Sequence, residues 1–196
     1  MREIVIEELE ESANIKRMIA QSLSDKIVNA AKIIIDTYKA GGKVLLIGNG
    51  GSAADAQHIA AELVGRFKLE RKGLPAIALT TDTSILTALA NDYGYDTVFS
   101  RQLEALATDK DVLIAITTSG TSPNILKAVE VAKSKNIKVI GLTGGDGGKL
   151  QDVADITIIV PSCNIPRIQE AHITIGHIIC NLVERRLFNE SSGISR

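Results

Sequence analysis

KVLLIGNGGS, residues 43–52, joins a short apolar run to a glycine-rich turn and the start of a helical pattern. An unbroken apolar run of this length is typical of a strand buried on both faces of a parallel sheet. Helical stretches separate it from four similar runs, which lie at 76–79, 111–117, 138–143 and 155–160. The sequence therefore predicts an α/β fold, a three-layer sandwich with a five-stranded parallel sheet.

Residues 2–40 carry apolar side chains at helical spacing and predict two helices, the second capped by Ser24. Periodicity leaves two alternatives for the apolar face of this pair: it packs on the chain's own sheet, or a partner subunit buries it. A long last helix is expected from about Arg167 to Phe188. We expect three parts along the chain: an oligomerising helical pair at 1–40, an α/β domain at 41–188 and a disordered polar tail at 189–196.

The composition excludes several classes of protein. The 196 residues are 45% hydrophobic and 23% charged, which fits one globular domain. Lys and Arg total 22 against 23 acidic residues, so the formal net charge of −1 provides no basic field for nucleic acid. Cys163 and Cys180 have no C-x-x-C spacing, which favours a reducing compartment over a disulfide framework. No signal-peptide pattern or apolar run of about 18 residues is found, so we expect a cytoplasmic protein and no membrane partner.

Ligands of parallel sheets bind beyond the carboxyl ends of the strands, and two loops there carry anion-binding chemistry. Gly48-Asn49-Gly50-Gly51-Ser52 allows close backbone approach and offers the free amides of a helix start, but it lacks the spacing of the dinucleotide fingerprint. In the loop 117–124, five of the first six residues carry a hydroxyl, and Ser122 is the expected helix cap. Ordinary turn chemistry is the alternative for both loops. A third glycine-rich turn, 144–148, has two alternatives, another wall of the pocket or only a connection, and is interpreted as a connection.

His58 and Glu62 fall one helical turn apart on the same face, about 6 Å along the axis. A histidine and a carboxylate so placed can share one metal ion or one proton path. A surface hydrogen bond is the alternative that spacing alone leaves open.

The loops at 48–52 and 118–122, each placed after a strand, resemble those of the SIS (sugar isomerase) family. The resemblance covers nearly the whole chain and implies the SIS fold, which is flavodoxin-like. Within the family, the chain is similar to enzymes that convert D-sedoheptulose 7-phosphate to D-glycero-D-manno-heptose 7-phosphate by aldose–ketose isomerisation. This similarity implies a homotetramer that performs the first step of ADP- or GDP-heptose precursor biosynthesis, with lipopolysaccharide core as the usual destination.

The resemblance also implies one zinc ion per subunit, bound by His58, Glu62, Gln169 and His177. It implies Glu62 as the base that transfers the carbon proton and His177 as the acid–base partner for the oxygens. Gln169 and His177 lie eight residues apart on the expected last helix, about 12 Å along its axis. Because two ligands of one zinc ion rarely start so far apart, we hypothesise a site at a subunit boundary that draws residues from more than one chain. His172 points away from His177 and is interpreted as structural.

Matching the family's motifs implies a substrate site composed of Asn49, Gly50, Gly51, Ser52, Glu62, Asn91, Asp92, Thr117, Thr118, Ser119, Ser122 and Gln169. Asn91 and Asp92 have turn formation as their alternative. Three alternatives stay open for Arg66, which can reach substrate, pair with Glu62 or lie on the surface. Pro166 departs from the family pattern, because some members carry an acid there.

The rival function is that of a non-catalytic SIS protein that binds the replication initiator DnaA. Relatives of that kind lack the acid and the histidine that this chain carries as Glu62 and His177, which favours the enzyme. Arabinose 5-phosphate isomerases and sugar-sensing transcription regulators are disfavoured, because we find neither CBS modules nor a DNA-binding segment in these 196 residues.

Overall fold

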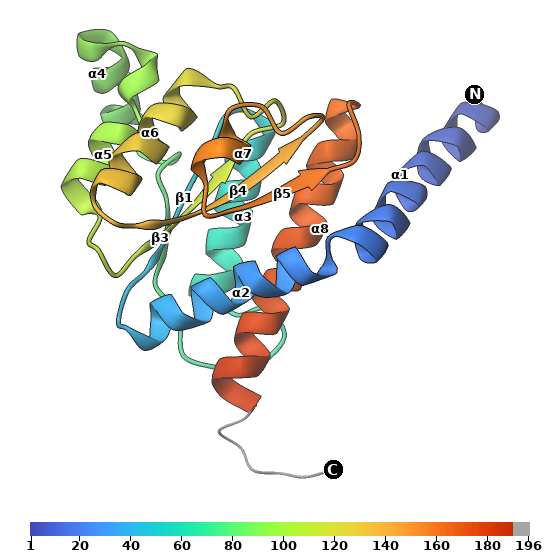
Figure 1. Ribbon diagram of the computed structural model, residues 1–196, viewed down its shortest axis with the longest axis horizontal. Coiled ribbons are helices and arrows are strands. Elements are labelled where there is room, and N and C mark those ends of the chain that lie inside the picture. Colours follow the sequence, from blue (N-terminus) through green and yellow to red (C-terminus); the bar gives the residue numbers. More distant parts are fainter. Residues whose placement is uncertain (190–196) are drawn as a thin grey trace.

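Five parallel strands form the middle layer of the structure, a computed structural model that describes residues 1–189 (Figure 1). The strands are β1 (Val44–Gly48), β2 (Ala76–Ala78), β3 (Val112–Ile116), β4 (Lys138–Gly144) and β5 (Ile156–Val160). Their order is β2-β1-β3-β4-β5, and every neighbouring pair is parallel. The predicted sheet is confirmed, and each strand begins and ends within one residue of its expected bounds.

Helices cover both faces of this sheet. Those within residues 1–189 are α1 (Arg2–Ser22), α2 (Ser24–Lys39), α3 (Gly51–Val64), α4 (Thr83–Tyr93), α5 (Ser100–Leu106), α6 (Pro123–Ser134), α7 (Leu150–Val153) and α8 (Ile165–Glu184), with the short 3-10 helix η1 (Tyr95–Thr97) and the π-helix η2 (Arg185–Asn189). None of them combines the length and apolar character that crossing a membrane requires. Residues 190–196 of the expected tail lie outside the described part of the chain.

Two of the bounds expected for the last helix are corrected. It begins at Ile165, two residues before Arg167, because Pro166 fits the first turn of a helix, where its missing N–H costs nothing. Its α-helical part ends at Glu184, after which η2 continues the chain.

Alternate side chains of each strand point to opposite faces and build two separate cores. In β3, Val112, Ile114 and Ile116 pack in the cluster that includes α2, α3 and α8. Leu113 and Ala115 pack on the other side, against α5 and α6. All five side chains are at most 2% exposed. Because burial of each large aliphatic side chain contributes about 1.5–3 kcal/mol, this alternation holds the register of the sheet and confirms the three-layer sandwich.

The sheet changes direction between β1 and β3. β1 pairs with β2 on one side and with β3 on the other, so the chain crosses over β1 on its way from β2 to β3. In an open α/β sheet, ligands bind at the carboxyl edge beside such a switch point. The loops that follow β1 and β3 are therefore the first place to look for a site.

The two N-terminal helices differ in whether they pack on the chain's own sheet. α2 belongs to the chain's own core, where Ala30 and Ile34 are fully buried. α1 buries only its second half, through Ile15 and Ile19, while its first half projects from the body of the protein (Figure 1). That half leaves side chains between 50% and 65% exposed, namely Ile4, Val5, Ile6 and Leu9. The apolar side chains in the first half of α1 thus stay exposed within the described chain.

Ser24 does not cap α2, because only Leu23 separates α2 from α1. The backbone hydrogen bonds run on through Leu23, whose amide donates to the carbonyl of Ile19 and whose carbonyl accepts from the amide of Ile27. The Ser24 hydroxyl donates to the carbonyl of Ala20 at 2.6 Å, four residues back. It therefore bonds the preceding turn, as a serine inside a helix does.

His172 of α8 is fully buried, which agrees with its structural interpretation. Its Nε2 lies 3.2 Å from the carbonyl oxygen of Thr143, and burial lowers its pKa to about 4. The unfolded chain therefore binds an extra proton between pH 6.5 and 4, and the fold loses stability as pH falls through this range. We expect His172 to account for a loss of about 3 kcal/mol between pH 7 and pH 4. Urea unfolding measures it, and His172→Gln should flatten the dependence; an unchanged slope would contradict the assignment.

Candidate functional site

Hydroxyl groups gather in the loop between β3 and α6, residues 117–122, which we call the hydroxyl loop. The Oγ1 of Thr117 lies 3.1 Å from the Oγ of Ser122 and 3.5 Å from the Oγ of Ser119. Ser119 Oγ also accepts hydrogen bonds from the backbone N–H and the hydroxyl of Thr121. Ser122 occupies the N-cap position of α6, as expected, but its side chain bonds Thr117 and makes no capping bond. Such hydroxyls beside a helix start can bind an anion without a lysine.

The glycine-rich turn at 144–148 packs directly against the hydroxyl loop. A Cβ on Gly120 would overlap the carbonyl oxygen of Gly147, and a Cβ on Gly148 would overlap that of Ser119. Both glycines also have a positive φ, of +67° and +54° respectively. The interpretation of this turn as a connection is therefore too narrow, because its backbone supports the hydroxyl loop from behind.

A pair of amides ties the loop after β1 to the start of α6. Asn49 Nδ2 donates to Asn124 Oδ1 at 2.9 Å, and Asn124 Nδ2 donates back to Asn49 Oδ1 at 2.8 Å. The Tyr95 hydroxyl donates to the same Asn49 oxygen at 3.2 Å. Asn124 is only 3% exposed, so the Asn124 side of the pair is buried. The two loops at the switch point are thus held as one unit.

α3 and α8 run side by side in the same direction, which Figure 1 shows and the contacts between them fix. Near the start of both helices, a Cβ on Gly51 would overlap the amide of Gln169. Further along, a Cβ on Gly176 would lie only 2.6 Å from Ile59 Cδ1, so glycine permits this close approach of the helices. We call this contact the α3–α8 seam. Since the two helices run in the same direction and Gly176 meets Ile59, the next residue of α8, His177, lies beside the middle of α3.

Three titratable side chains meet on the seam. His58 Nε2 lies 3.1 Å from Glu62 Oε1 and 3.2 Å from His177 Nε2. The ligand atoms of these three residues all lie within 4.8 Å of one another. The side chains of His58 and Glu62 are 48% and 25% exposed, so a ligand can reach them. We call His58, Glu62 and His177 the triad.

The triad has the donor chemistry of a zinc site. Zinc binds imidazole nitrogen and carboxylate oxygen at about 2.0–2.2 Å, so ligand atoms on a tetrahedral ion stand roughly 3.3–3.5 Å apart. The distances from His58 Nε2 to the ligand atoms of Glu62 and His177, 3.1 and 3.2 Å, are close to this spacing, and all three atoms lie within 4.8 Å of one another. Three protein ligands also leave a fourth position open, as catalytic zinc sites do. The residues present therefore fit the metal that the resemblance implies.

The structure brings three of the four expected zinc ligands together within one chain. The spacing argument for a shared site does not hold for His177, because the seam carries it to His58 and Glu62 of the same chain. Gln169, the fourth expected ligand, stays a prediction. Its amide lies beside Gly51, which precedes His58 by seven residues, or about 10 Å along the axis of α3. Gln169 therefore lies at the end of the seam where α3 begins.

Three further residues considered for the site, Asn91, Asp92 and Arg66, lie on the surface. Asn91 and Asp92 are exposed on α4, where the amide of Asn91 donates to the carboxylate of Asp92 at 2.8 Å. Tyr95, shortly beyond them, is the residue that reaches Asn49. Arg66 has left α3, is 60% exposed, and pairs with Glu70 at 3.6 Å instead of with Glu62. Of the three alternatives for Arg66, the structure therefore shows the position on the surface.

The sequence and the fold are similar to those of known proteins. The family model for the SIS domain matches residues 9–144. The phosphoheptose isomerase of Citrifermentans bemidjiense is 61% identical over 166 residues, which cover 85% of this chain and 86% of that protein. The chain belongs to the phosphoheptose isomerases of the SIS family. Solved phosphoheptose isomerases from Neisseria gonorrhoeae and Francisella tularensis, both 44% identical, cover 93% of this chain and 98% and 97% of their own, with TM-scores of 0.89 and 0.90.

Sequence patterns missed several residues that shape the site in this phosphoheptose isomerase family member. Asn124 and Tyr95 have no motif that marks them, although Asn124 follows the hydroxyl loop directly. Phe67 packs its ring 5.5 Å from the ring of His177, and Arg71 and Glu184 form a buried ion pair behind it. A lone Arg and a lone Glu 113 residues apart carry no local signal of pairing.

Gly148→Ala should weaken substrate binding by about tenfold, seen as a raised KM with a smaller change in kcat. The added methyl would displace the Ser119 carbonyl and with it the hydroxyl loop. Gly145→Ala is the matched control, because Gly145 also has a positive φ of +60° but no atom within 4 Å of an added Cβ. Steady-state kinetics of both variants test this prediction. An equal rise in KM for both would assign the effect to backbone strain and not to the hydroxyl loop.

Proposed function

We propose that this protein converts D-sedoheptulose 7-phosphate to D-glycero-D-manno-heptose 7-phosphate. The observation that carries the proposal is the triad of His58, Glu62 and His177, which offers a carboxylate and two imidazoles at one exposed point of the seam. The hydroxyl loop supplies anion chemistry at the switch point near the other end of α3. A heptose 7-phosphate has its reacting carbons and its phosphate at opposite ends, so one molecule spans two such groups.

The reaction moves one proton between carbons and another between oxygens. The Glu62 carboxylate removes the proton from C1 of the ketose and returns it to C2. His177 donates a proton to the oxygen on C2 and accepts one from the oxygen on C1, so that atoms and charge balance over the cycle. Zinc held by His58, Glu62 and His177 would polarise the carbonyl and stabilise negative charge on oxygen, which is worth several kcal/mol in such sites.

The rest of the proposed site holds the substrate. Hydroxyls and amides of Thr117, Thr118, Ser119 and Ser122 bind the phosphate, since the loop contains no competing charge. The sugar lies along the loop of Asn49, Gly50, Gly51 and Ser52, next to Gln169, whose amide lies beside Gly51. Gln169 is also proposed as the fourth ligand of the zinc ion.

We propose a homotetramer as the working assembly. The exposed apolar face of α1 supports this, because contiguous apolar side chains on one helix favour burial by a second copy. α4, which carries Asn91 and Asp92, has no buried residue of its own, so a neighbouring subunit could also pack on this helix. Light scattering tests the assembly, and a monomer would reject it.

The product supplies a cytoplasmic route to ADP- or GDP-heptose, with lipopolysaccharide core as its proposed destination. The rival function, binding of DnaA, has no observation in its favour, since the chain keeps both Glu62 and His177 at the triad.

The test is turnover of D-sedoheptulose 7-phosphate, followed by NMR as the aldose appears, with the metal-free protein and with added zinc. We expect turnover that depends on zinc and on the hydroxyl loop. No turnover in either sample would exclude the enzyme.

A further inference from the structure

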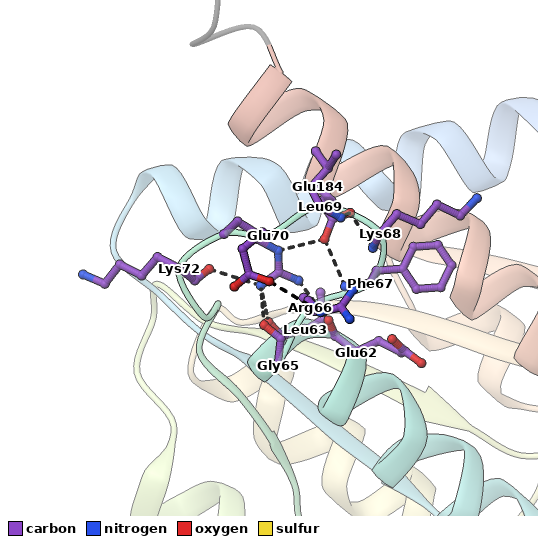
Figure 2. A network of polar contacts seen from close by, with 11 residues as sticks. Glu62, Leu63, Gly65, Arg66, Phe67, Lys68, Leu69, Glu70, Lys72 and Glu184 are labelled. Carbon is purple, nitrogen blue, oxygen red and sulfur yellow. Dashed lines mark hydrogen bonds and ion pairs between the residues drawn. The ribbon is translucent and has the colours of Figure 1, made fainter.

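The segment between α3 and β2 is held by one carboxylate, that of Glu184 at the end of α8. Its Oε1 accepts hydrogen bonds from the amides of Lys68 and Leu69, and its Oε2 accepts from the amide of Phe67, all at 2.7–3.0 Å. Oε2 also accepts from Arg71 Nε at 2.9 Å. Figure 2 shows these bonds converging from the segment on a single side chain. Both oxygens of Glu184 are therefore occupied.

Arg71 extends this network to the helix that carries Glu62. Its Nη2 donates to the carbonyl of Glu62 at 2.9 Å, and its Nη1 donates to the carbonyl of Leu63 at 2.8 Å. The last carbonyls of a helix have no amide of the same helix to bond. Arg71 thus closes the final turn of α3, which is the turn that contains Glu62.

The ion pair of Arg71 and Glu184 is dry. The two side chains are 2% and 1% exposed, and the ring of Phe188 lies over the guanidinium at 5.7 Å. Burial by itself raises the pKa of Glu184, but the three amides and Arg71 hold that pKa below its ordinary value. The pair is therefore charged and geometrically defined.

The same network also reaches His177, through the ring of Phe67. Glu184 holds the backbone of Phe67, and the ring of Phe67 packs against the ring of His177 with centroids 5.5 Å apart. His177 and Glu184 also lie on one helix, seven residues apart. The ion pair is thus bonded to the backbone of Glu62 on one side and braces the ring of His177 on the other.

We propose that Arg71 and Glu184 are positioning residues that hold Glu62 and His177 at the separation the reaction needs. This inference rests on the proposed function. Neither side chain reaches the triad itself, so the pair acts through the last turn of α3 and through Phe67. Residues in such supporting positions typically change metal affinity or activity by about 10- to 100-fold when altered.

Arg71→Lys and Glu184→Gln test the inference, because each keeps most of the volume but not the fork or the charge. The control is Asp111→Asn, which alters a carboxylate that is 1% exposed and paired with Lys43. Lys43 and Asp111 directly precede β1 and β3, at the opposite ends of these strands from the candidate site. For each folded variant, the zinc affinity of the metal-free protein is measured by calorimetry, and kcat and KM by NMR turnover.

We expect Arg71→Lys and Glu184→Gln to lower kcat and zinc affinity by about 10- to 100-fold, with KM within a factor of about three. Asp111→Asn should lose stability but keep both quantities within twofold. Equal losses in all three variants, or unchanged kcat and zinc affinity in the two test variants, would overturn the inference. An inactive wild-type protein would instead reject the proposed function.

Phe67→Leu keeps the inference testable if the ion-pair variants do not fold. It removes the ring beside His177 and leaves the bonds between Arg71, Glu184 and the backbone in place. We expect kcat and zinc affinity each to fall several-fold, with a smaller loss of thermal stability than in the ion-pair variants. Wild-type values of kcat and zinc affinity would remove Phe67, and with it the route from Glu184 to His177.

Discussion

Glu62→Gln should lower kcat by about 10³-fold, because general base catalysis contributes 10²–10⁴-fold and an amide cannot take the carbon proton. The substitution keeps the shape of the side chain on α3, so the fold and the binding of the phosphate should not change. The carboxylate also belongs to the triad, where Glu62 Oε1 lies 3.1 Å from His58 Nε2, so a weaker zinc site is expected as well. Turnover of D-sedoheptulose 7-phosphate, measured at saturating zinc, separates the two effects.

Glu70→Gln is the matched control for this change. Glu70 lies eight residues further along the chain, is 92% exposed and pairs only with Arg66 among the described residues. Its substitution should leave kcat within twofold. Full activity of Glu62→Gln at saturating zinc would remove Glu62 from the role of base and leave it, at most, as a ligand.

Arg71→Met should destabilise the fold by about 3–5 kcal/mol, the usual cost of removing one partner from a buried ion pair. The loss arises because Glu184 would stay buried with no cation beside it, and because the carbonyl of Glu62 would lose the hydrogen bond from Arg71. The carbonyl of Leu63 would keep only its bond from the amide of Leu74. The free energy of unfolding, measured in urea near pH 7, gives the magnitude.

Arg66→Met separates this effect from the loss of a positive charge in the same segment. Arg66 is 60% exposed and its partner Glu70 is 92% exposed, so the pair contributes less than about 1 kcal/mol. A destabilisation of Arg71→Met no larger than that of Arg66→Met would show that the buried pair does not stabilise the segment.

The architecture could be predicted from the sequence because it depends on local patterns. Unbroken apolar runs such as that of β1 are long enough for one strand and too short for a helix, and the glycine-rich turn after it marks its end. The cap at Ser24 was predicted wrongly, since one residue between two helices lets the backbone hydrogen bonds continue. Local pattern thus located the elements better than it described their junctions.

For the candidate site too, local spacing predicted some residues and long-range contacts decided the others. The pair of His58 and Glu62 follows from helical spacing, because residues four apart share a face of any helix. His177 joined them by resemblance alone, and spacing suggested a second subunit, because distance along one helix says nothing about the neighbour on which that helix packs. The seam resolves this within one chain, where Gly176 lets α8 approach α3 closely.

By itself, the sequence determined the order of strands and helices along the chain, the two candidate anion-binding loops and two of the three triad residues, since each depends on side chains a few positions apart. Only the tertiary structure decided that His177 meets His58, that the turn at 144–148 supports the hydroxyl loop, and that Arg71 pairs with Glu184. These contacts join segments that are far apart in the chain. They exist because burial of the two cores brings those segments together, and no periodicity in the sequence records which ones will meet.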